Sequence, residues 1–305
     1  MSKTISVDLP ASVRQRLLNL SRDRGEDFNF VLTRYAVERL LYRITRSEYA
    51  SQFILKGASL IAVWTGRELR PTRDVDLLGL GDSSDEWIIQ VFQQICSVDV
   101  EPDGLQFNPE IIRVEDIREG QAYGGQRVRL LANLGNARIT VQIDIAFGDP
   151  VTPEAKEISY PTLLDFPAPR ILAYPPESVV AEKLEALVSL GMVTTRMKDI
   201  YDLRLMARLL TFEGSTLIDA IRATFNSRDT EIPTTTPTAL SAEFVKDEDK
   251  PKQWAAFLIR SGLEKPDIEL IEVIGELRSF LVLPLEAAAT GTEFVKSWRH
   301  GGPWA

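Results

Sequence analysis

The sequence has very few of the side chains on which many enzyme sites depend. Among 305 residues there is one histidine, His300, and one cysteine, Cys96. A Ser-His-Asp triad, a Cys-His pair or a Cys/His zinc site needs more than these two residues supply. A single cysteine also excludes an internal disulfide framework, which is typical of a reducing cytoplasm. If the protein is an enzyme, carboxylates and hard metal ions are therefore the expected catalytic groups.

Long apolar runs are absent as well. No stretch approaches the ~20 residues that a membrane-spanning helix needs, and the first residues, MSKTISVDLP, contain no apolar signal-peptide core. We therefore expect a cytoplasmic protein with no membrane partner. The net charge of −9 argues against a uniformly basic coat for nucleic acid, although a local basic strip is compatible with it.

The order of the expected elements predicts an α+β fold in three parts. Residues 1–50 are expected to be a helical segment packed on the core, residues 51–176 a domain of strands and helices, and residues 177–305 a mainly helical domain. The charged run at 246–252 is expected to be a solvated loop. Expected helices cover residues 10–24, 30–44, 84–97, 178–191, 196–210 and 267–280, and expected strands cover residues 72–78, 111–114, 126–134, 137–147 and 171–174.

Residues 53–78, FILKGASLIAVWTGRELRPTRDVDLL, are the most informative stretch. They predict a strand, a turn, an apolar helix and a second strand that carries Asp74 and Asp76. Alternation along a strand puts the two carboxylates on one face, where they can converge on a divalent cation. Gly57 and Ser59 fall where the helix begins, and the free N–H groups of a helix start attract phosphate. A phosphate seat followed by an acidic pair is what nucleotidyl transfer requires.

A third acid, Asp144, lies in the middle of the strand expected at 137–147. An aspartate among β-branched residues has to be hydrogen-bonded, ion-paired or metal-bound. A structural ion pair explains Asp144 taken alone. Together with Asp74 and Asp76, a metal site is the better interpretation.

Two expected helices carry charges on their apolar faces. Lys183 falls within the apolar arc of the first helix, and Asp199 and Asp202 fall on the apolar face of the second. A buried Lys183–Asp199 bridge between the helices is one explanation. A place for both residues at the rim of a nucleotide pocket is the other, and helical periodicity does not separate the two. Glu182, Glu185, Arg204 and Arg208 are expected outside the apolar arcs.

Five motifs, taken in order, resemble the AbiEii/AbiGii-type nucleotidyltransferases, a family of toxins of bacterial toxin–antitoxin and abortive-infection systems that includes the MenT toxins. The motifs are KGASL (56–60), TRDVDLL (72–78), QIDIA (142–146), AEKL (181–184) and RMKDIYDL (196–203). The resemblance implies a polymerase-β-like nucleotidyltransferase domain, followed by a helical domain that contributes to the active-site cleft. One departure is that Ala58 separates Gly57 from Ser59, where the wider pattern has adjacent Gly and Ser.

The resemblance also implies roles for individual residues. Gly57 and Ser59 would bind the triphosphate, and Asp74 and Asp76 would hold Mg²⁺ or Mn²⁺. The remaining expected site residues are Asp144 as a third carboxylate and metal ligand, Lys183 and Asp199 at later essential positions, and Lys56, Arg196 and Lys198 as nucleotide contacts.

The activity implied by the resemblance is transfer of nucleotides from NTP to the 3′ acceptor end of tRNA, with a cognate antitoxin as partner. Modification of a protein or small-molecule hydroxyl remains an alternative, as does a catalytically inactive binding module. A protein of this net charge can grip RNA only where positive charge is concentrated. The candidate strips are Arg14, Arg16, Arg22 and Arg24 near the start, and Arg127, Arg129 and Arg138 on the expected strands. A solvated sheet face explains Arg127 and Arg129 equally well.

Overall fold

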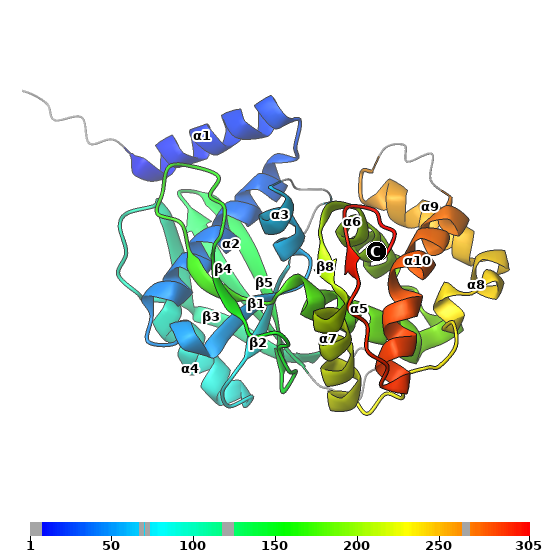
Figure 1. The fold of residues 1–305 in the computed structure, drawn as a ribbon. Coiled ribbons are helices and arrows are strands. Elements are labelled where there is room, and N and C mark those ends of the chain that lie inside the picture. Colours follow the sequence, from blue (N-terminus) through cyan, green and yellow to red (C-terminus); the bar gives the residue numbers. More distant parts are fainter. Residues whose placement is uncertain (1–7, 67–69, 71–73, 118–124, 264–268) are drawn as a thin grey trace, which may run out of the picture. The chain divides into compact units, whose positions relative to one another are not determined.

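The structure is a computed structural model, and it describes residues 8–66, 70, 74–117, 125–263 and 269–305. The chain divides into two compact units (Figure 1). Unit 1 comprises Met1–Gly57, Thr72–Gly148 and Glu157–Ala173, and unit 2 comprises Ala58–Pro71, Asp149–Lys156 and Tyr174–Ala305. Neither unit is one continuous stretch of chain.

Unit 1 contains a seven-stranded mixed sheet with the order β3-β4-β5-β2-β1-β7-β6. Strand β2 is parallel to β5, and β1 is parallel to β7. The β1–β2, β3–β4 and β4–β5 pairs are antiparallel. The mixed α+β architecture expected from the sequence is therefore confirmed. The strands are β1 (Phe53–Lys56), β2 (Val75–Gly79), β3 (Leu105–Ile117), β4 (Gly125–Leu134), β5 (Ala137–Phe147), β6 (Lys156–Ser159) and β7 (Arg170–Ala173).

Three helices of unit 1 pack against this sheet: α1 (Leu9–Arg24), α2 (Phe28–Arg46) and α4 (Asp85–Cys96). Side-chain caps define where the first two begin. Asp8 accepts a hydrogen bond from the Ala11 N–H, and Asp27 accepts one from the Phe30 N–H, each satisfying an otherwise unpaired amide of a first turn. All three helices were expected from the sequence, within one or two residues at each end.

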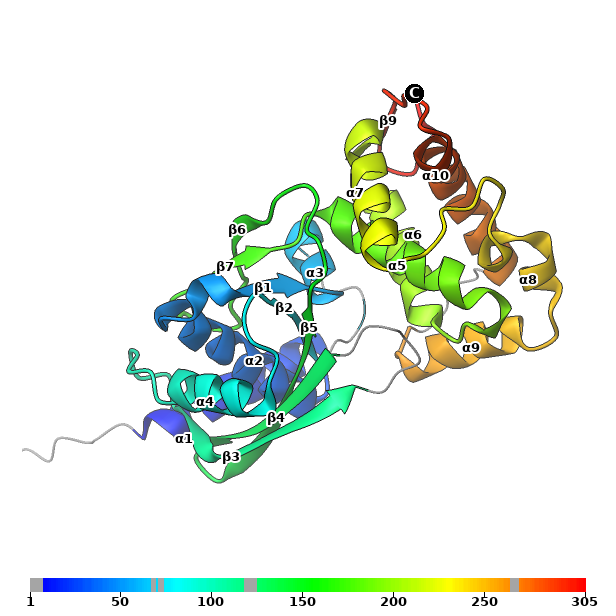
Figure 2. The same ribbon diagram turned by 90° about the horizontal axis from the view of Figure 1, so that it is seen from below.

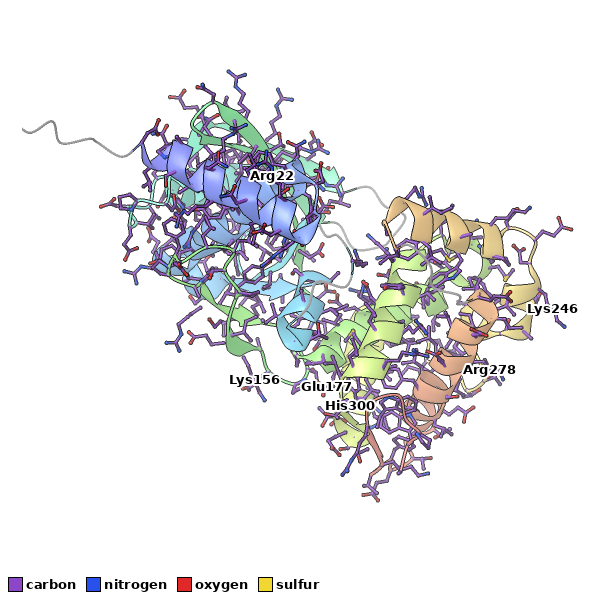
Figure 3. All side chains as sticks on the ribbon, turned by 90° about the horizontal axis from the view of Figure 1, so that it is seen from above. Arg22, Lys156, Glu177, Lys246, Arg278 and His300 are labelled. Atoms are coloured by element: carbon purple, nitrogen blue, oxygen red, sulfur yellow. The ribbon has the colours of Figure 1, made fainter. Side chains whose placement is uncertain are left out.

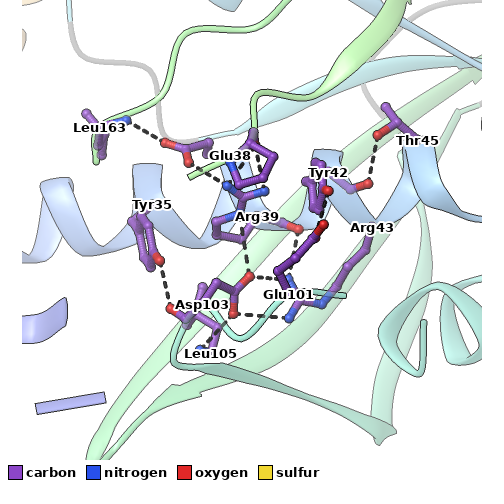
Figure 4. A network of polar contacts seen from close by, with 11 residues as sticks. Tyr35, Glu38, Arg39, Tyr42, Arg43, Thr45, Glu101, Asp103, Leu105 and Leu163 are labelled. Carbon is purple, nitrogen blue, oxygen red and sulfur yellow. Dashed lines mark hydrogen bonds and ion pairs between the residues drawn. The ribbon is translucent and has the colours of Figure 1, made fainter. Parts of the chain in front are cut away.

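A buried polar network ties α2 to two loops of unit 1 (Figure 4). The Arg43 guanidinium donates to both carboxylate oxygens of Asp103, at 2.7 and 3.2 Å. Glu38 accepts a hydrogen bond from the Leu163 N–H at 2.7 Å, and Arg39 donates to the Pro167 carbonyl. Because charged hydrogen bonds are strong only when both partners are in place, the network specifies how these loops lie on α2.

Unit 2 is mainly helical (Figure 2). Helix α5 packs on α6 and α7, and α10 packs on α6 and α7. None of the helices in the described part of the chain combines the length and the apolar character needed to cross a bilayer. The helices are α3 (Ser59–Thr65), α5 (Pro176–Leu190), α6 (Met197–Leu209), α7 (Gly214–Ser227), α8 (Ala242–Lys246), α9 (Lys250–Arg260) and α10 (Leu270–Thr290).

The last helix differs from the expectation. It was expected to end at residue 280, but α10 continues to Thr290, with Pro284 inside it. The residues that follow fold back: β9 (Ser297–Trp298) pairs with β8 (Phe212–Glu213). The indole N–H of Trp298 donates to the Ala207 carbonyl at 2.6 Å. The single histidine, His300, is exposed in the turn after β9 (Figure 3).

Three charged residues expected to face solvent are buried instead. Glu185, Arg204 and Lys250 are 3%, 5% and 5% exposed. Each has a polar partner from another element, which a helical wheel of one segment does not reveal. The partners are Arg228 for Glu185, Glu276 for Arg204 and the Thr194 carbonyl for Lys250.

Candidate functional site

Strand register in unit 1 lines up charged residues on neighbouring strands. Lys56 of β1 lies opposite Asp76 of β2, and Asp76 lies opposite Asp144 of β5. Asp144 in turn lies opposite Arg127 of β4. Side chains of directly paired residues project from the same face of a sheet. We call Lys56, Asp76, Asp144 and Arg127 the strand row.

The apolar side chains on the opposite face of the same strands fix the register of the strand row. Val75 and Leu77, the neighbours of Asp76 in β2, are 2% and 0% exposed, and Ile143 and Ile145 beside Asp144 are 1% and 0% exposed. A shift of one residue in register would exchange these apolar side chains for the carboxylates. The alternation expected for Val75, Asp76 and Leu77 is confirmed.

Asp74 differs from the expectation in one respect. Strand β2 begins at Val75, so Asp74 lies in the bend just before the strand and is exposed. The two residues before it lie outside the described part of the chain. The strand expected at 72–78 is thus found only from Val75 onward. Asp74 and Asp76 remain two residues apart in the chain, but only Asp76 takes part in the sheet pairing.

Position 57 has to be a glycine because the Asp76 carboxylate lies against its Cα. Its φ of +77° is in the left-handed region, which glycine adopts without strain. A Cβ atom added at Gly57 would overlap the Oδ2, Cγ and Cβ atoms of Asp76. The backbone after β1 therefore leaves room for this carboxylate, and a larger residue would displace it. Helix α3 of unit 2 begins at Ser59, as expected, without a side-chain cap.

Asp144 accepts hydrogen bonds from two residues of unit 1. Arg127 donates from Nε to Oδ1 at 2.8 Å and from Nη2 to Oδ2 at 2.7 Å. Gln142 Nε2 donates to Oδ1 at 3.4 Å. The Arg127 and Asp144 side chains are 27% and 20% exposed. A bidentate Arg–carboxylate pair of this kind is among the stronger polar contacts in proteins.

The basic strip expected on β4 is neutralised by acids. Arg127 pairs with Asp144, and Arg129 donates to both carboxylate oxygens of Glu115, at 3.1 and 2.9 Å. Each arginine therefore has a carboxylate partner within the sheet. Positive charge at these two positions is already offset, which weakens the argument that the pair grips successive phosphates.

In unit 2, a second cluster forms around Lys183. Its Nζ donates to Asp199 Oδ1 at 2.6 Å and to Asp202 Oδ2 at 2.8 Å. Arg196 Nε donates to the other oxygen of Asp199. Arg70 donates to both oxygens of Asp202, at 2.6 and 2.8 Å. We call these five residues the Lys183 cluster; it has three cations and two carboxylates.

Burial makes the charges of the Lys183 cluster interdependent. The side chains of Lys183, Asp199 and Asp202 are 11%, 2% and 0% exposed. Burial alone lowers the pKa of the Lys183 ammonium, but Asp199 and Asp202 more than offset this and hold the pKa above its ordinary value. Burial likewise raises the pKa of Asp199, but Lys183 and Arg196 hold that pKa well below its ordinary value. Lys183 and Asp199 are therefore both charged at neutral pH.

Sequence reasoning identified part of this cluster. The Lys183–Asp199 bridge was one of the two explanations left open, and the structure brings these residues together. Arg196 joins them, whereas Lys198, expected to contact the nucleotide, is exposed and takes no part in the cluster. Arg70 was missed, because it reaches Asp202 from 132 residues away in the chain.

Asp76 of the strand row and Asp74, two residues before it in the chain, offer carboxylate oxygens that suit a small hard cation. Within the described residues, no three Asp, Glu, His or Cys side chains gather closely enough to enclose a metal ion. Mg²⁺, however, commonly binds through one or two carboxylates, with waters and substrate phosphates completing its shell. Asp76, held against Gly57, and Asp74 beside it fit that requirement. The residues present are thus compatible with Mg²⁺ or Mn²⁺.

A mixed sheet with aspartates aligned on neighbouring strands is the arrangement expected of a nucleotidyltransferase. The profile of the family described as "Nucleotidyl transferase AbiEii toxin, Type IV TA system" matches residues 39–280. The chain belongs to this family, so the resemblance drawn from the five motifs is confirmed and the protein is a nucleotidyltransferase.

Comparison with other proteins adds two solved structures from Helicobacter pylori. A candidate nucleotidyltransferase from this organism is 15% identical, with 83% of this chain and 92% of that chain covered and a TM-score of 0.43. The protein JHP933 is 14% identical, with 83% and 89% covered and a TM-score of 0.42. No curated protein matches the sequence.

Proposed function

We propose that this toxin transfers nucleotides from an NTP to the 3′ acceptor end of tRNA with the help of Mg²⁺, and so blocks translation. The alignment of Asp76 and Asp144 in the strand row is the observation that carries the proposal. It places Asp76 against a glycine that makes room for it, beside a second strand with an aligned aspartate. A cognate antitoxin is the expected partner, because the family belongs to toxin–antitoxin systems.

In this proposal, Asp74 and Asp76 hold the cation. When bound, Mg²⁺ would offset negative charge on the phosphates during the displacement. A hydroxyl oxygen of the acceptor forms a bond to the α-phosphorus and loses its proton to solvent. The bond from the α-phosphorus to the bridging oxygen breaks, and pyrophosphate leaves with that electron pair.

Individual residues are proposed to contact the phosphates of the nucleotide. Lys56, Gly57 and Ser59 are proposed to bind the phosphates. From the Lys183 cluster, Lys183 and Arg196 would supply positive charge, with Asp199 holding both in place through its two oxygens. Positive groups that are oriented before substrate arrives stabilise developing charge without reorganisation.

Incubation of the purified protein with Mg²⁺ and each labelled NTP, in the presence of total RNA and total protein, tests the proposal. We expect label in the tRNA fraction and an added mass at the tRNA 3′ end. Label in protein with tRNA of unchanged mass would refute the tRNA acceptor and favour the alternative of protein modification. Absence of label in any fraction would favour an inactive module.

Two substitutions locate the site. Asp74→Asn and Asp76→Asn should each lower transfer by at least about 100-fold, because a charged group that stabilises the reaction is lost. Both variants should stay folded, since removal of one of two crowded like charges relieves repulsion. Asp116→Asn is the matched control, because Asp116 is an exposed aspartate of β3 in the same sheet. If Asp76→Asn retains full Mg²⁺-dependent transfer, the assignment is wrong.

A further inference from the structure

We propose that Arg127 is a positioning residue that keeps Asp144 out of the cation site, so that the site binds its divalent cation through Asp74 and Asp76 alone. The inference rests on the proposed function, because it takes the Asp76 position of the strand row as the cation site. The sequence predicted that Asp144 would be a third metal ligand; here Asp144 is instead held by Arg127 and does not bind the cation.

The backbone geometry would allow Asp144 to be a ligand. Asp76 and Asp144 are direct partners in the register of parallel strands β2 and β5. Neighbouring strands lie about 4.8 Å apart, and carboxylate oxygens bind Mg²⁺ at about 2.1 Å. Two carboxylates at this separation can reach one cation between them. The question is therefore whether the oxygens of Asp144 are available.

The contacts of Asp144 answer this question. An ionised carboxylate offers about four acceptor positions. Both nitrogens of the Arg127 fork occupy one position on each oxygen, and Gln142 Nε2 occupies a second position on Oδ1. Arginine side chains carry their positive charge in proteins generally. Arg127 thus occupies one acceptor position on each oxygen of Asp144 and offsets the charge of the carboxylate before any cation arrives.

A site with two carboxylates suits the expected reaction better than one with three. Mg²⁺ bound through few carboxylates keeps exchangeable waters, which substrate phosphates can replace. A third carboxylate would bind the cation more tightly and leave fewer positions for the phosphates. In this scheme Arg127 sets the number of protein ligands, although it touches neither the cation nor the nucleotide.

Arg129 provides a matched control on the same strand. It lies two residues beyond Arg127 on the same face of β4, and it donates to Glu115 and, at 3.4 Å, to Gln142 Oε1, whereas Arg127 donates to Asp144 itself. Arg129→Leu and Arg127→Leu remove the same charge from the same strand. Only the substitution at Arg127 releases Asp144, so a change in general electrostatic attraction would affect both variants alike.

The experiment is titration of the full-length protein with Mn²⁺ alone, with free Mn²⁺ followed by electron paramagnetic resonance. Arg127→Leu is expected to bind Mn²⁺ about tenfold more tightly than the wild type, which corresponds to about 1.4 kcal/mol. The double variant Arg127→Leu with Asp144→Asn should return to the wild-type affinity. Asp144→Asn alone and Arg129→Leu alone should each change the affinity less than about twofold, a ratio that is equivalent to about 0.4 kcal/mol.

Two outcomes would overturn the inference. A marked loss of Mn²⁺ affinity in Asp144→Asn would show that Asp144 is already a ligand in the wild type. Equal affinities of Arg127→Leu and Arg129→Leu would show that only net charge matters. If Arg127→Leu does not fold, Asp144→Asn decides the matter by itself. Arg127→Lys gives a further test. Lysine keeps the positive charge but cannot bind both carboxylate oxygens as arginine does, so its Mn²⁺ affinity should lie between those of the wild type and Arg127→Leu.

Failure of the underlying site assignment gives a different result. If Asp76→Asn binds Mn²⁺ as tightly as the wild type, the cation site lies elsewhere and the proposed function is wrong at that point. If Asp76→Asn loses binding while Arg127→Leu does not gain it, the site stands and the role of Arg127 is refuted. Mn²⁺ affinity is the readout in each case, so loss of activity by misfolding does not confuse the two.

Discussion

Replacement of Lys183 by methionine removes the cation that two buried carboxylates of unit 2 share. Its ammonium donates to Asp199 at 2.6 Å and to Asp202 at 2.8 Å. Methionine has a similar unbranched stem, so the packing of α5 should be retained while the charge is lost. The substitution therefore isolates the electrostatic contribution of the Lys183 cluster.

The expected cost follows from what remains in the Lys183 cluster. Breaking a buried ion pair by removal of one partner costs about 3–5 kcal/mol. Here Arg196 still pairs with Asp199, and Arg70 still pairs with Asp202. Neither carboxylate is left without a cation, so we expect a smaller loss, about 2–3 kcal/mol of the free energy of unfolding.

The pH dependence gives a second, independent signature. The depressed pKa of Asp199 contributes stability that is complete above the unfolded-state pKa of about 3.9 and is lost as pH falls below it. The raised pKa of Lys183 contributes stability that is complete below about pH 10.4 and is lost as pH rises further. The difference between wild type and Lys183→Met should thus be constant between about pH 5 and 10 and shrink in acid.

Urea denaturation of the wild type and Lys183→Met across this pH range measures both signatures. A difference below about 0.5 kcal/mol at neutral pH, or one that persists unchanged to about pH 3, would refute the electrostatic reasoning. Transfer assays on the same samples separate structure from function. If Lys183 acts on the nucleotide, activity should fall far more than the folded fraction does, and Lys183→Arg should recover part of it.

Three further predictions concern unit 1. Gly57→Ala should destabilise the protein by about 1–3 kcal/mol and displace Asp76, because the position has a positive φ and no room for a Cβ; unfolding and Mn²⁺ binding measure both effects. Burial raises the pKa of Glu38 to about 7, so ionisation costs stability as pH rises from 4.5 to 7. As pH rises from 4.5 to 7, the free energy of unfolding of Glu38→Gln should therefore increase relative to that of the wild type, by up to roughly 3 kcal/mol in urea denaturation. Burial also raises the pKa of the Cys96 thiol to about 12, so the folded protein should not react with a thiol reagent at pH 8.

Each of these has a clear contrary result. Normal Mn²⁺ affinity in Gly57→Ala would mean that the Asp76 carboxylate tolerates displacement. A difference between Glu38→Gln and the wild type that does not vary with pH would mean that Glu38 is not ionising in this range. Rapid labelling of Cys96 at a rate above that of unfolding would contradict its burial.

Local pattern was enough to predict most elements and some of the site. Strand β5 covers the same residues as the expected strand, because alternation between buried and polar side chains is a property of the strand alone. The apolar-face positions of Lys183 and Asp199 were also visible from helical periodicity. In each of these cases the signal lies within one segment of about 15 residues.

Pairings between distant segments could not be predicted in the same way. Arg127 was a candidate contact for RNA phosphates or part of a solvated sheet face, and its pairing with Asp144 was not foreseen, because only the register between β4 and β5 decides it. Glu185 was expected to face solvent, yet it pairs with Arg228, which comes from the end of α7. A single sequence records neither register nor helix packing, so the partners of buried charges are the least predictable part of the site.

Both units contain segments that lie far apart in the sequence, and this limits how early in synthesis each unit can complete its folding. Strand β1 pairs with β7, so the sheet of unit 1 is complete only after residue 173 has left the ribosome. Helix α3 packs on α6, which is more than 130 residues further along the chain. A nascent chain that stops before residue 199 already contains the whole strand row but neither aspartate of the Lys183 cluster. If the Lys183 cluster is needed for nucleotide transfer as proposed, chains that end before residue 199 should be inactive in the transfer assay.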